Sequence, residues 1–130
     1  MILVTGSTGY IGSQITYFLE SNNIKYIGID NFLHSSNFNI YNKKKFFNLN
    51  ISNSGKIKKI IKKFNIKTVI HCAASSYVLE GEKNKKKYLL NNYSSTVKFI
   101  NTCKNAHISN FIFLSSSNVY KPKNSSYLEK

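Results

Sequence analysis

Three of the six glycines lie close together near the N-terminus, at Gly6, Gly9 and Gly12. In such a run, the first glycine lets the chain turn sharply off a strand, the second lets backbone amides approach a pyrophosphate, and the third lets a helix pack closely against the sheet. The helix N-terminus adds unpaired N–H groups and the positive end of its dipole. The spacing therefore predicts a phosphate-binding turn, provided that a strand precedes it and a helix follows.

Asp30 is the only aspartate of the chain and lies 18 residues after Gly12. A carboxylate at this distance, at the end of the second strand, can accept hydrogen bonds from both ribose hydroxyls of an adenosine and would repel a 2′-phosphate. The pattern favours NAD over NADP as the ligand. The alternative is an aspartate that only caps a loop, and the spacing argues against it.

The elements that must position these residues alternate along the chain. Strands are predicted at Ile2–Thr5, Lys25–Ile29, around Phe46, Phe47 and Leu49, at Thr68–His71 and at Phe111–Leu114. Helices are predicted at Tyr10–Ser21, Ser54–Asn65 and about Lys85–Asn105, and the polar stretch Asn31–Lys45 is predicted to be a loop. This alternation predicts an α/β fold with a doubly wound parallel sheet of the Rossmann type, incomplete, with about five strands in the spatial order 3-2-1-4-5.

Two of the predicted helices carry an apolar face. In the first, these positions are Ile57, Ile60, Ile61 and Phe64, and the lysines face away. In the second, they are Leu89, Tyr93, Thr96, Phe99, Ile100 and Cys103. A basic amphipathic helix can lie on a membrane, but it more often covers a sheet, which is the interpretation preferred here.

The net charge of +14 comes from 19 basic residues, all of which are lysine. Nucleic-acid readers depend on arginine for bidentate contacts, so the composition favours a solvated lysine surface over a nucleic-acid site. The two cysteines and three scattered histidines predict free thiols and no metal site. The apolar runs are too short for a membrane span or a signal peptide. We therefore expect a cytoplasmic, single-domain protein without nucleic-acid or membrane partners.

The glycine spacing is Gly-x-x-Gly-x-x-Gly rather than Gly-x-Gly-x-x-Gly, and further stretches fit one family pattern in the same order. The matching stretches are Val4–Ser13, Asp30-Asn31, Thr68–Ala74 with Val78 and Glu80, Asn91-Asn92 with Thr96, and Asn110–Phe113 running into Ser115–Tyr120. They cover nearly the whole chain and resemble the extended short-chain dehydrogenase/reductase superfamily, in particular its NAD-dependent epimerase/dehydratase family. Within that family they look most like the UDP-glucose 4-epimerases, although this narrower match is less specific.

The resemblance implies NAD as the cofactor. Tyr10 and Ile11 would cover the pyrophosphate at the start of the helix. Asp30 and Asn31 would hold the adenosine ribose. The full set of cofactor-binding positions that it implies is Gly6, Gly9, Tyr10, Ile11, Gly12, Asp30, Asn31, Asn50, Ile51, Cys72, Ala73, Ala74, Ser76 and Asn92.

Three positions depart from the family pattern. Asn50, followed by Ile51, takes the place of an aspartate whose carboxylate usually binds the adenine amino group, and its amide oxygen can still accept that hydrogen bond. Ser76 stands where a lysine usually lies near the pyrophosphate, so that charge contact is lost. Lys121 replaces the glycine that usually follows the Val-Tyr pair, which changes the local loop.

The implied chemistry is a reversible oxidation that interconverts UDP-glucose and UDP-galactose through a 4-keto intermediate. A tyrosine base removes the proton of the sugar 4-hydroxyl while hydride moves to NAD, and hydride then returns to the other face of the sugar. A nearby lysine lowers the pKa of the tyrosine. Ser116, four residues before Tyr120, matches the serine that hydrogen-bonds the reacting hydroxyl.

The resemblance places the catalytic Tyr-x-x-x-Lys pair after residue 130. Tyr127 and Lys130 are three residues apart rather than four, and four are needed to bring both side chains to one helix face. We therefore expect residues 1–130 to be the N-terminal, NAD-binding part of such an enzyme, inactive alone, without the catalytic helix and the sugar-binding domain. The complete enzyme would bind a nucleotide sugar and form a homodimer.

Two alternatives remain open. The chain can belong to another NAD-dependent nucleotide-sugar epimerase or dehydratase, because the residues that separate these enzymes lie mostly after Lys130. It can also be a non-catalytic dinucleotide-binding module used for sensing or regulation.

Overall fold

The computed structural model describes residues 1–116, so the expectations for Val119-Tyr120, Lys121 and Tyr127–Lys130 lie outside the described part. Its strands are β1 (Ile2–Thr5), β2 (Tyr26–Asp30), β3 (Phe46–Asn48), β4 (Thr68–His71) and β5 (Asn110–Phe113). Its helices are α1 (Tyr10–Ser21), α2 (Ser54–Lys63), α3 (Val78–Lys83), α4 (Lys85–Leu89) and α5 (Ser95–Asn105). Short 3-10 turns lie at Asn37–Asn39 and Lys43–Lys45, and a π-helical turn lies at Leu90–Ser94.

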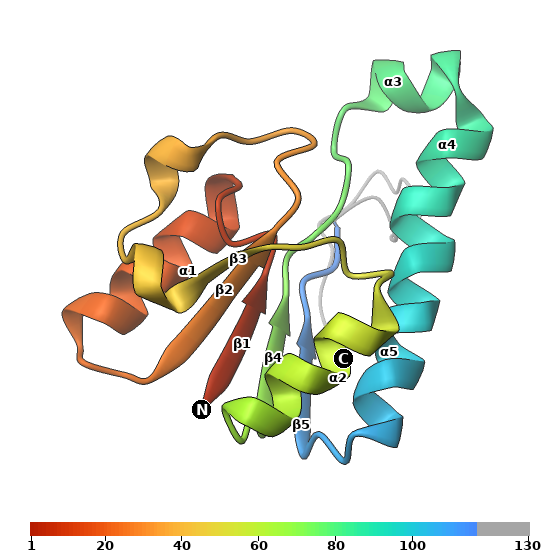
Figure 1. The fold of residues 1–130 in the computed structure, drawn as a ribbon. Helices are drawn as coiled ribbons and strands as arrows, with labels where there is room; N and C mark the ends of the chain where they lie inside the picture. Colours follow the sequence, from red (N-terminus) through yellow and green to blue (C-terminus); the bar gives the residue numbers. More distant parts are fainter. Residues whose placement is uncertain (117–130) are drawn as a thin grey trace, which may run out of the picture.

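The strands form one parallel sheet in the order β3-β2-β1-β4-β5, which confirms the predicted fold class and strand order (Figure 1). The central strand β1 sets the register, because Ile2 pairs with Tyr26 on one side and with Thr68 on the other. Parallel strands place all their carboxyl ends at one edge, so the segments that follow each strand come together there.

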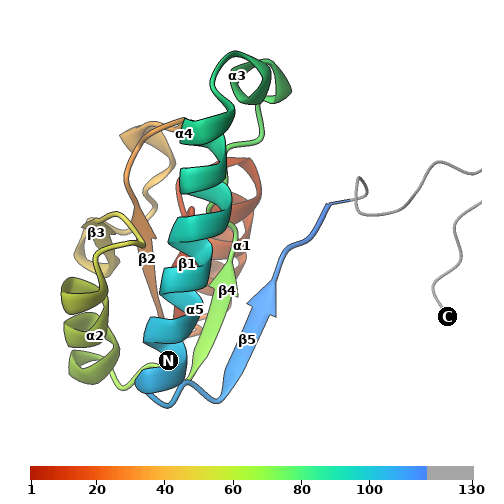
Figure 2. The same cartoon turned by 90° about the vertical axis from the view of Figure 1, so that its right-hand side faces the viewer.

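Helices cover both faces of the sheet, with α1 on one and α2 and α5 on the other (Figure 2). On the α1 face, Leu19 packs with Val4 and Tyr26. The opposite face holds the larger core. Its buried members are Leu3, Ile27, Ile29, Leu49, Ile51, Ile57, Ile60, Ile61, Ile66, Val69, Phe99 and Cys103. The apolar face of the basic helix α2 is therefore buried against the sheet, as the sheet-covering interpretation predicts.

The predicted long helix forms as α4, the π-helical turn and α5 in sequence. Ser95 Oγ donates to the carbonyl of Leu90 at 2.9 Å, five residues back, within this wider turn. A π turn inserts one residue into the helical phase, so positions before it rotate relative to those after it. Leu89, just before this turn, and Tyr93, inside it, are 60% and 68% exposed, against the predicted apolar face.

After the π-helical turn, the predicted pattern holds in part. Thr96, Phe99 and Cys103 are buried, as expected, but Ile100 is 40% exposed. Thr102 is buried instead and donates to Ser54 Oγ at 2.9 Å, which joins α5 to the start of α2. Helix α3 was not predicted, because its six residues are too few to show a period.

None of the described helices is long and apolar enough to cross a bilayer.

His71 ties three elements together inside the core. It is 2% exposed; its Nδ1 lies 2.7 Å from Thr5 Oγ1 in β1, and its Nε2 lies 3.1 Å from Thr96 Oγ1 in α5. Its ring also stacks on Phe99 with centroids 5.3 Å apart. Burial in this apolar setting disfavours the imidazolium and lowers the pKa of His71 to about 4.

We therefore predict that acid destabilises the chain through His71. Between about pH 6.5 and pH 4, His71 is protonated in the unfolded state but stays neutral in the native state. The free energy of unfolding therefore falls as the pH is lowered through this window. The full loss is about 3 kcal/mol for a shift of this size. Urea denaturation between pH 4 and 7 measures it, and His71→Gln should flatten the slope. A wild-type stability that stays level across this window would contradict the prediction.

Apolar side chains lie open on the α1 face of the sheet. Ile11 and Phe18 of α1 are 54% and 60% exposed, because the small residues of this helix face the sheet instead. Ile112 of β5 is 49% exposed and alternates with Phe111 and Phe113, which contact His71 on the other side. An uncovered apolar face of this kind favours association.

We predict that the purified 130-residue chain self-associates through this face. Light scattering after gel filtration should give a mass well above the monomer value of 14.9 kDa. The double substitution Phe18→Ser and Ile112→Ser should lower that mass, whereas Leu79→Ser, at a more exposed leucine on α3, should leave it unchanged. A monodisperse wild-type monomer would refute the prediction.

Candidate functional site

A cavity of about 810 Å³ opens at the carboxyl edge of the sheet. Every strand contributes to it through the segment that follows its last residues. These contributions include Gly6 after β1, Asp30 at the end of β2, Asn50 after β3, Cys72 after β4 and Leu114 after β5. Ligands of open α/β sheets bind at this edge, so its position marks the cavity as the candidate functional site.

The glycine turn forms one wall of the cavity. Gly6 has φ +65°, and a Cβ there would lie 2.8 Å from the backbone of Ala73. A Cβ on Gly12 would lie 2.0 Å from the Gly6 carbonyl oxygen, so no side chain fits. Gly9 is the N-cap of α1 and no side chain caps the helix, so its first-turn amides remain open to a ligand. The turn has the shape and the donors of an anion cradle.

Asp30 lies beside this cradle and joins it to the next loop. Its Oδ2 accepts from the backbone N–H of Thr8 at 3.1 Å, and its Oδ1 accepts from the N–H of Phe32 at 2.9 Å and from Ser35 Oγ at 3.2 Å. Asp30 therefore caps the loop, as the alternative interpretation predicts, and it also lines the cavity. A carboxylate offers about four acceptor positions, so capacity remains for a ligand hydroxyl.

The end of β3 forms the neighbouring wall. The N–H of Leu49 donates to the Asp30 carbonyl at 2.8 Å, which sets this segment directly beside the end of β2. Leu49 and Ile51 are each 8% exposed and line the cavity with their apolar side chains. Asn50 also lines it, and its Oδ1 accepts from the N–H of Ser52 at 2.9 Å. The amide oxygen that was expected to accept from adenine therefore already has a partner.

Small residues after β4 form the floor. The N–H of Ala73 donates to Thr5 Oγ1 at 3.3 Å, so the buried Thr5–His71 pair also holds the chain that lines the cavity. Burial raises the pKa of the Cys72 thiol to about 11. Cys72 therefore stays protonated near neutral pH and lines the cavity as a small apolar side chain, not as a nucleophile.

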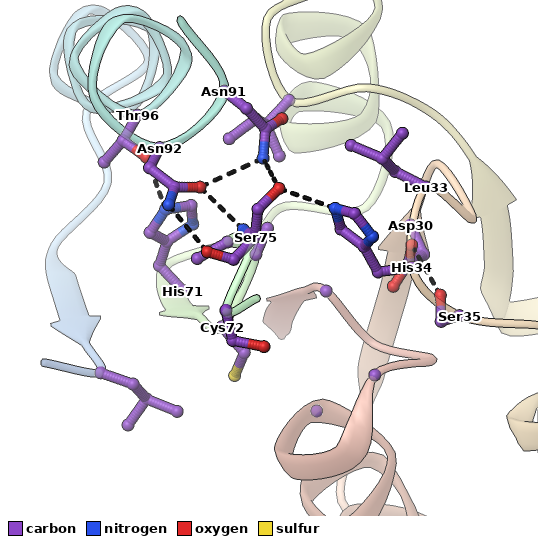
Figure 3. A pocket seen from close by; sticks show the side chains of 18 of the residues that line it. Asp30, Leu33, His34, Ser35, His71, Cys72, Ser75, Asn91, Asn92 and Thr96 are labelled. Carbon is purple, nitrogen blue, oxygen red and sulfur yellow. Dashed lines mark hydrogen bonds between the residues drawn. The ribbon is translucent and has the colours of Figure 1, made fainter. Parts of the chain in front are cut away.

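Ser75, which the sequence did not single out, is the centre of a hydrogen-bond network above this floor (Figure 3). Asn92 accepts from the Ser75 N–H at 2.7 Å and donates to its carbonyl at 2.8 Å. Asn91 Nδ2 donates to Ser75 Oγ at 2.9 Å. Asn92 thus lines the cavity as predicted by position, but both polar groups of its side chain already bind backbone.

His34 joins the two sides of the cavity. Its Nε2 lies 2.8 Å from Ser75 Oγ and 3.1 Å from Glu80 Oε2, and its ring contacts Tyr77 with centroids 5.5 Å apart. Figure 3 shows this ring reaching from the loop after β2 toward Ser75. His34 and Ser75 are 41 residues apart, so no local sequence signal connects them.

The cavity lining contains no lysine within residues 1–116. One Tyr-x-x-x-Lys pair occurs within residues 1–116, at Tyr41 and Lys45, but neither residue lines the cavity. Lys45 instead forms an ion pair with Glu20 at 2.7 Å. The described residues also hold no group of three His, Cys, Asp or Glu side chains that could bind a metal ion.

The structure brings every predicted site residue to this one cavity. The lining includes Gly6, Gly9, Tyr10, Ile11, Gly12, Asp30, Asn31, Asn50, Ile51, Cys72, Ala73, Ala74, Ser76, Asn92 and Ser116. It also includes residues that the sequence patterns did not mark for a site, namely Leu33, His34, Ser35, Leu49, Ser75, Tyr77, Tyr88 and Asn91. The contacts of each predicted residue with a cofactor or substrate stay predictions.

Known proteins resemble this chain in sequence and in architecture. The chain is 35% identical to the dTDP-D-glucose 4,6-dehydratase of Dictyostelium discoideum and 33% identical to the UDP-glucose 4-epimerase of Haemophilus influenzae, over 92% of its own length in each case. It spans 29% and 37% of those two proteins. A solved UDP-glucose 4-epimerase from Brucella ovis, in complex with NAD, superposes with a TM-score of 0.88 at 27% identity, over 95% of this chain and 38% of that one.

The model of one protein family, described as the NAD-dependent epimerase/dehydratase family, matches residues 2–129. This match covers almost the whole chain and agrees with the glycine turn, the strand order and the cavity at the carboxyl edge. The chain belongs to the NAD-dependent epimerase/dehydratase family.

Proposed function

We propose that residues 1–130 bind NAD as the cofactor-binding part of a nucleotide-sugar 4-epimerase. The observation that carries the proposal is the 3.1 Å hydrogen bond from Thr8 N to Asp30 Oδ2. It sets the open amides of α1 beside Asp30, the single acidic side chain in the cavity lining that residues 1–116 form. The cradle would hold the pyrophosphate and the carboxylate would accept from a hydroxyl of the adjoining ribose.

The residues fit such a cofactor on steric grounds as well. Side chains at Gly6 and Gly12 would collide with backbone, so the cradle keeps bare amides where a diphosphate would lie. NAD, when bound, supplies a hydride acceptor for a sugar carbon. The chain's own residues would bind and orient, and Ser116 in the cavity wall would hold the reacting sugar hydroxyl. UDP-glucose and UDP-galactose are the proposed substrates, supported by relatives such as the Haemophilus epimerase.

A nucleotide-sugar 4,6-dehydratase is the second candidate. The 35% identity to the Dictyostelium dehydratase favours it, since that value is similar to the identity with the epimerase. Both enzyme classes need a bound dinucleotide to oxidise the sugar, so the described cavity would serve either.

We also propose that the complete enzyme is a homodimer. Tyr93, Val97 and Ile100 are 68%, 40% and 40% exposed on the outer side of the long helix. These residues follow helical spacing and would supply an apolar seam for a second copy.

The proposed function predicts which dinucleotide the chain prefers. The chain should bind NAD at least about tenfold more tightly than NADP, because a 2′-phosphate would lie against the Asp30 carboxylate. Asp30→Asn should narrow this preference by removing the charge. Fluorescence titration of each dinucleotide measures the ratio, with thermal melting to verify that the variant folds. Equal wild-type affinities for NAD and NADP would refute the assignment of Asp30.

The proposed function also predicts that the chain alone has no epimerase activity. The purified 130-residue chain, given NAD and UDP-glucose, should form no UDP-galactose. The reason is that no lysine lines the described cavity, so nothing there lowers the pKa of a neighbouring tyrosine toward neutrality. Chromatography of the nucleotide sugars after long incubation measures this. Interconversion above the protein-free control would contradict it.

A further inference from the structure

The hydroxyl of Ser75 is a buried polar group in the cavity lining. Ser75 is 3% exposed, and Asn92 binds both its backbone N–H and its carbonyl. The hydroxyl is therefore the polar group of Ser75 that remains for a ligand. Its Oγ lies 2.8 Å from His34 Nε2 and 2.9 Å from Asn91 Nδ2 (Figure 3). Whether these two nitrogens donate or accept decides where the hydroxyl hydrogen points.

Glu80 fixes the role of the His34 nitrogen. Glu80 Oε2 lies 3.1 Å from the same Nε2 atom, and the other carboxylate oxygen lies 3.3 Å from Lys87 Nζ. A carboxylate oxygen only accepts hydrogen bonds, so it would repel a ring nitrogen that presented a lone pair at this distance. Nε2 therefore carries a hydrogen in the neutral ring as well as in the charged one. His34 consequently donates to Ser75 Oγ.

The second nitrogen, Nδ2 of Asn91, is also a donor. It donates to Asn92 Oδ1 at 3.2 Å as well as to Ser75 Oγ, and Asn92 Oδ1 is identified as oxygen because it accepts the Ser75 backbone N–H. A hydroxyl oxygen has two acceptor positions and one hydrogen. Both acceptor positions of Ser75 Oγ are thus filled, and no acceptor within residues 1–116 takes its hydrogen. The hydrogen is available to an acceptor in the cavity.

This donor lies near the glycine turn. A Cβ on Gly6 would lie 2.8 Å from the backbone of Ala73, so the segment after β4 touches the turn there. Ser75 follows two residues later, which is at most about 7 Å of extended chain. Its hydroxyl offers a hydrogen but no acceptor position, so it suits an oxygen that has no hydrogen of its own. A phosphate oxygen of a diphosphate is such an acceptor, whereas a sugar hydroxyl brings a hydrogen that Ser75 could not accept.

We propose that Ser75 is a diphosphate-binding residue of this cavity and that His34 is its positioning residue, which rests on the proposed function. The Ser75 hydroxyl donates to a phosphate oxygen from the segment after β4, while the amides of α1 donate from the glycine turn. Glu80 selects the His34 tautomer, and His34 and Asn91 together direct the Ser75 hydrogen away from themselves. The resulting contact is a hydrogen bond to a charged acceptor, which is stronger than one between neutral groups.

Isothermal titration of the 130-residue chain with NAD and with ADP tests the role of Ser75. Both ligands contain the diphosphate, but only NAD contains a second ribose. Ser75→Ala should weaken the binding of each by about tenfold or more, and by the same factor, because each loses one hydrogen bond to a charged oxygen. The variant should fold, because His34 and Asn91 keep acceptors in Glu80 and Asn92.

Ser95→Ala is the matched control for this substitution. Ser95 is also a buried serine, but its Oγ donates to the carbonyl of Leu90 at 2.9 Å, and it lies outside the cavity lining. The dissociation constants for NAD and ADP should therefore stay at the wild-type values.

His34→Phe tests the positioning role. It keeps a ring beside Tyr77 but removes the N–H that donates to Ser75. The freed hydroxyl can rotate, so we expect NAD to bind about threefold more weakly. In a chain that already carries Ser75→Ala, the same substitution should have no further effect, because no hydroxyl is left to direct. A purely structural role of His34 would weaken binding equally in both backgrounds.

Each contrary result has a distinct meaning. If Ser75→Ala is folded by thermal melting and binds both ligands like the wild type, or if Ser95→Ala weakens binding equally, the role of Ser75 is overturned. A loss for NAD but not for ADP assigns the hydroxyl to the second ribose and overturns the diphosphate contact. An effect of His34→Phe that persists beside Ser75→Ala overturns the positioning role. If neither ligand binds the wild-type chain, the proposed function itself fails, and the inference fails with it.

Discussion

The close approach of two stretches of backbone, at Gly6 and Gly12, is the constraint on which the site depends. The carbonyl of Gly6 fills the space where any Cβ on Gly12 would lie, and Gly6 itself rests against the backbone of Ala73. Helix α1, the turn after β1 and the segment after β4 can therefore come together only because side chains are missing at these points. This packing leaves the first amides of α1 open at the carboxyl edge of the sheet, where the other strand ends also meet.

Polar side chains then fix the loops that surround this turn. Asp30 binds the backbone of Thr8 and Phe32, Asn92 binds both backbone groups of Ser75, and His34 reaches Ser75 from the opposite side. Irregular backbone at a cavity has no ladder to satisfy its donors and acceptors, so side chains must do it. The same residues that line the cavity consequently also hold its shape, and their substitution will affect both properties together.

The sequence was sufficient for the fold and for the cavity lining where the signal is local. The apolar runs predicted the strand order, and the glycine spacing and the single aspartate predicted the first wall of the cavity. The family resemblance supplied the other predicted lining residues. The sequence was insufficient where tertiary contacts decide. Leu89 and Tyr93, at and inside the π-helical turn, lie off the expected face, and the contact of His34 with Ser75 joins residues 41 positions apart. The hydrogen bond from the Ser52 N–H to Asn50 Oδ1 could not be predicted either, because it depends on the local path of the chain after β3.

The absence of lysine from the described cavity lining has a consequence for a protein of net charge +14. A diphosphate in this cavity would be held by hydrogen bonds from backbone N–H groups, which salt screens less than it screens contacts between exposed charges. The lysine-covered exterior, in contrast, attracts anions of every kind weakly and loses them as ionic strength rises. Physiological salt would therefore weaken the binding of anions to the exterior more than it weakens the binding of a diphosphate in the cavity.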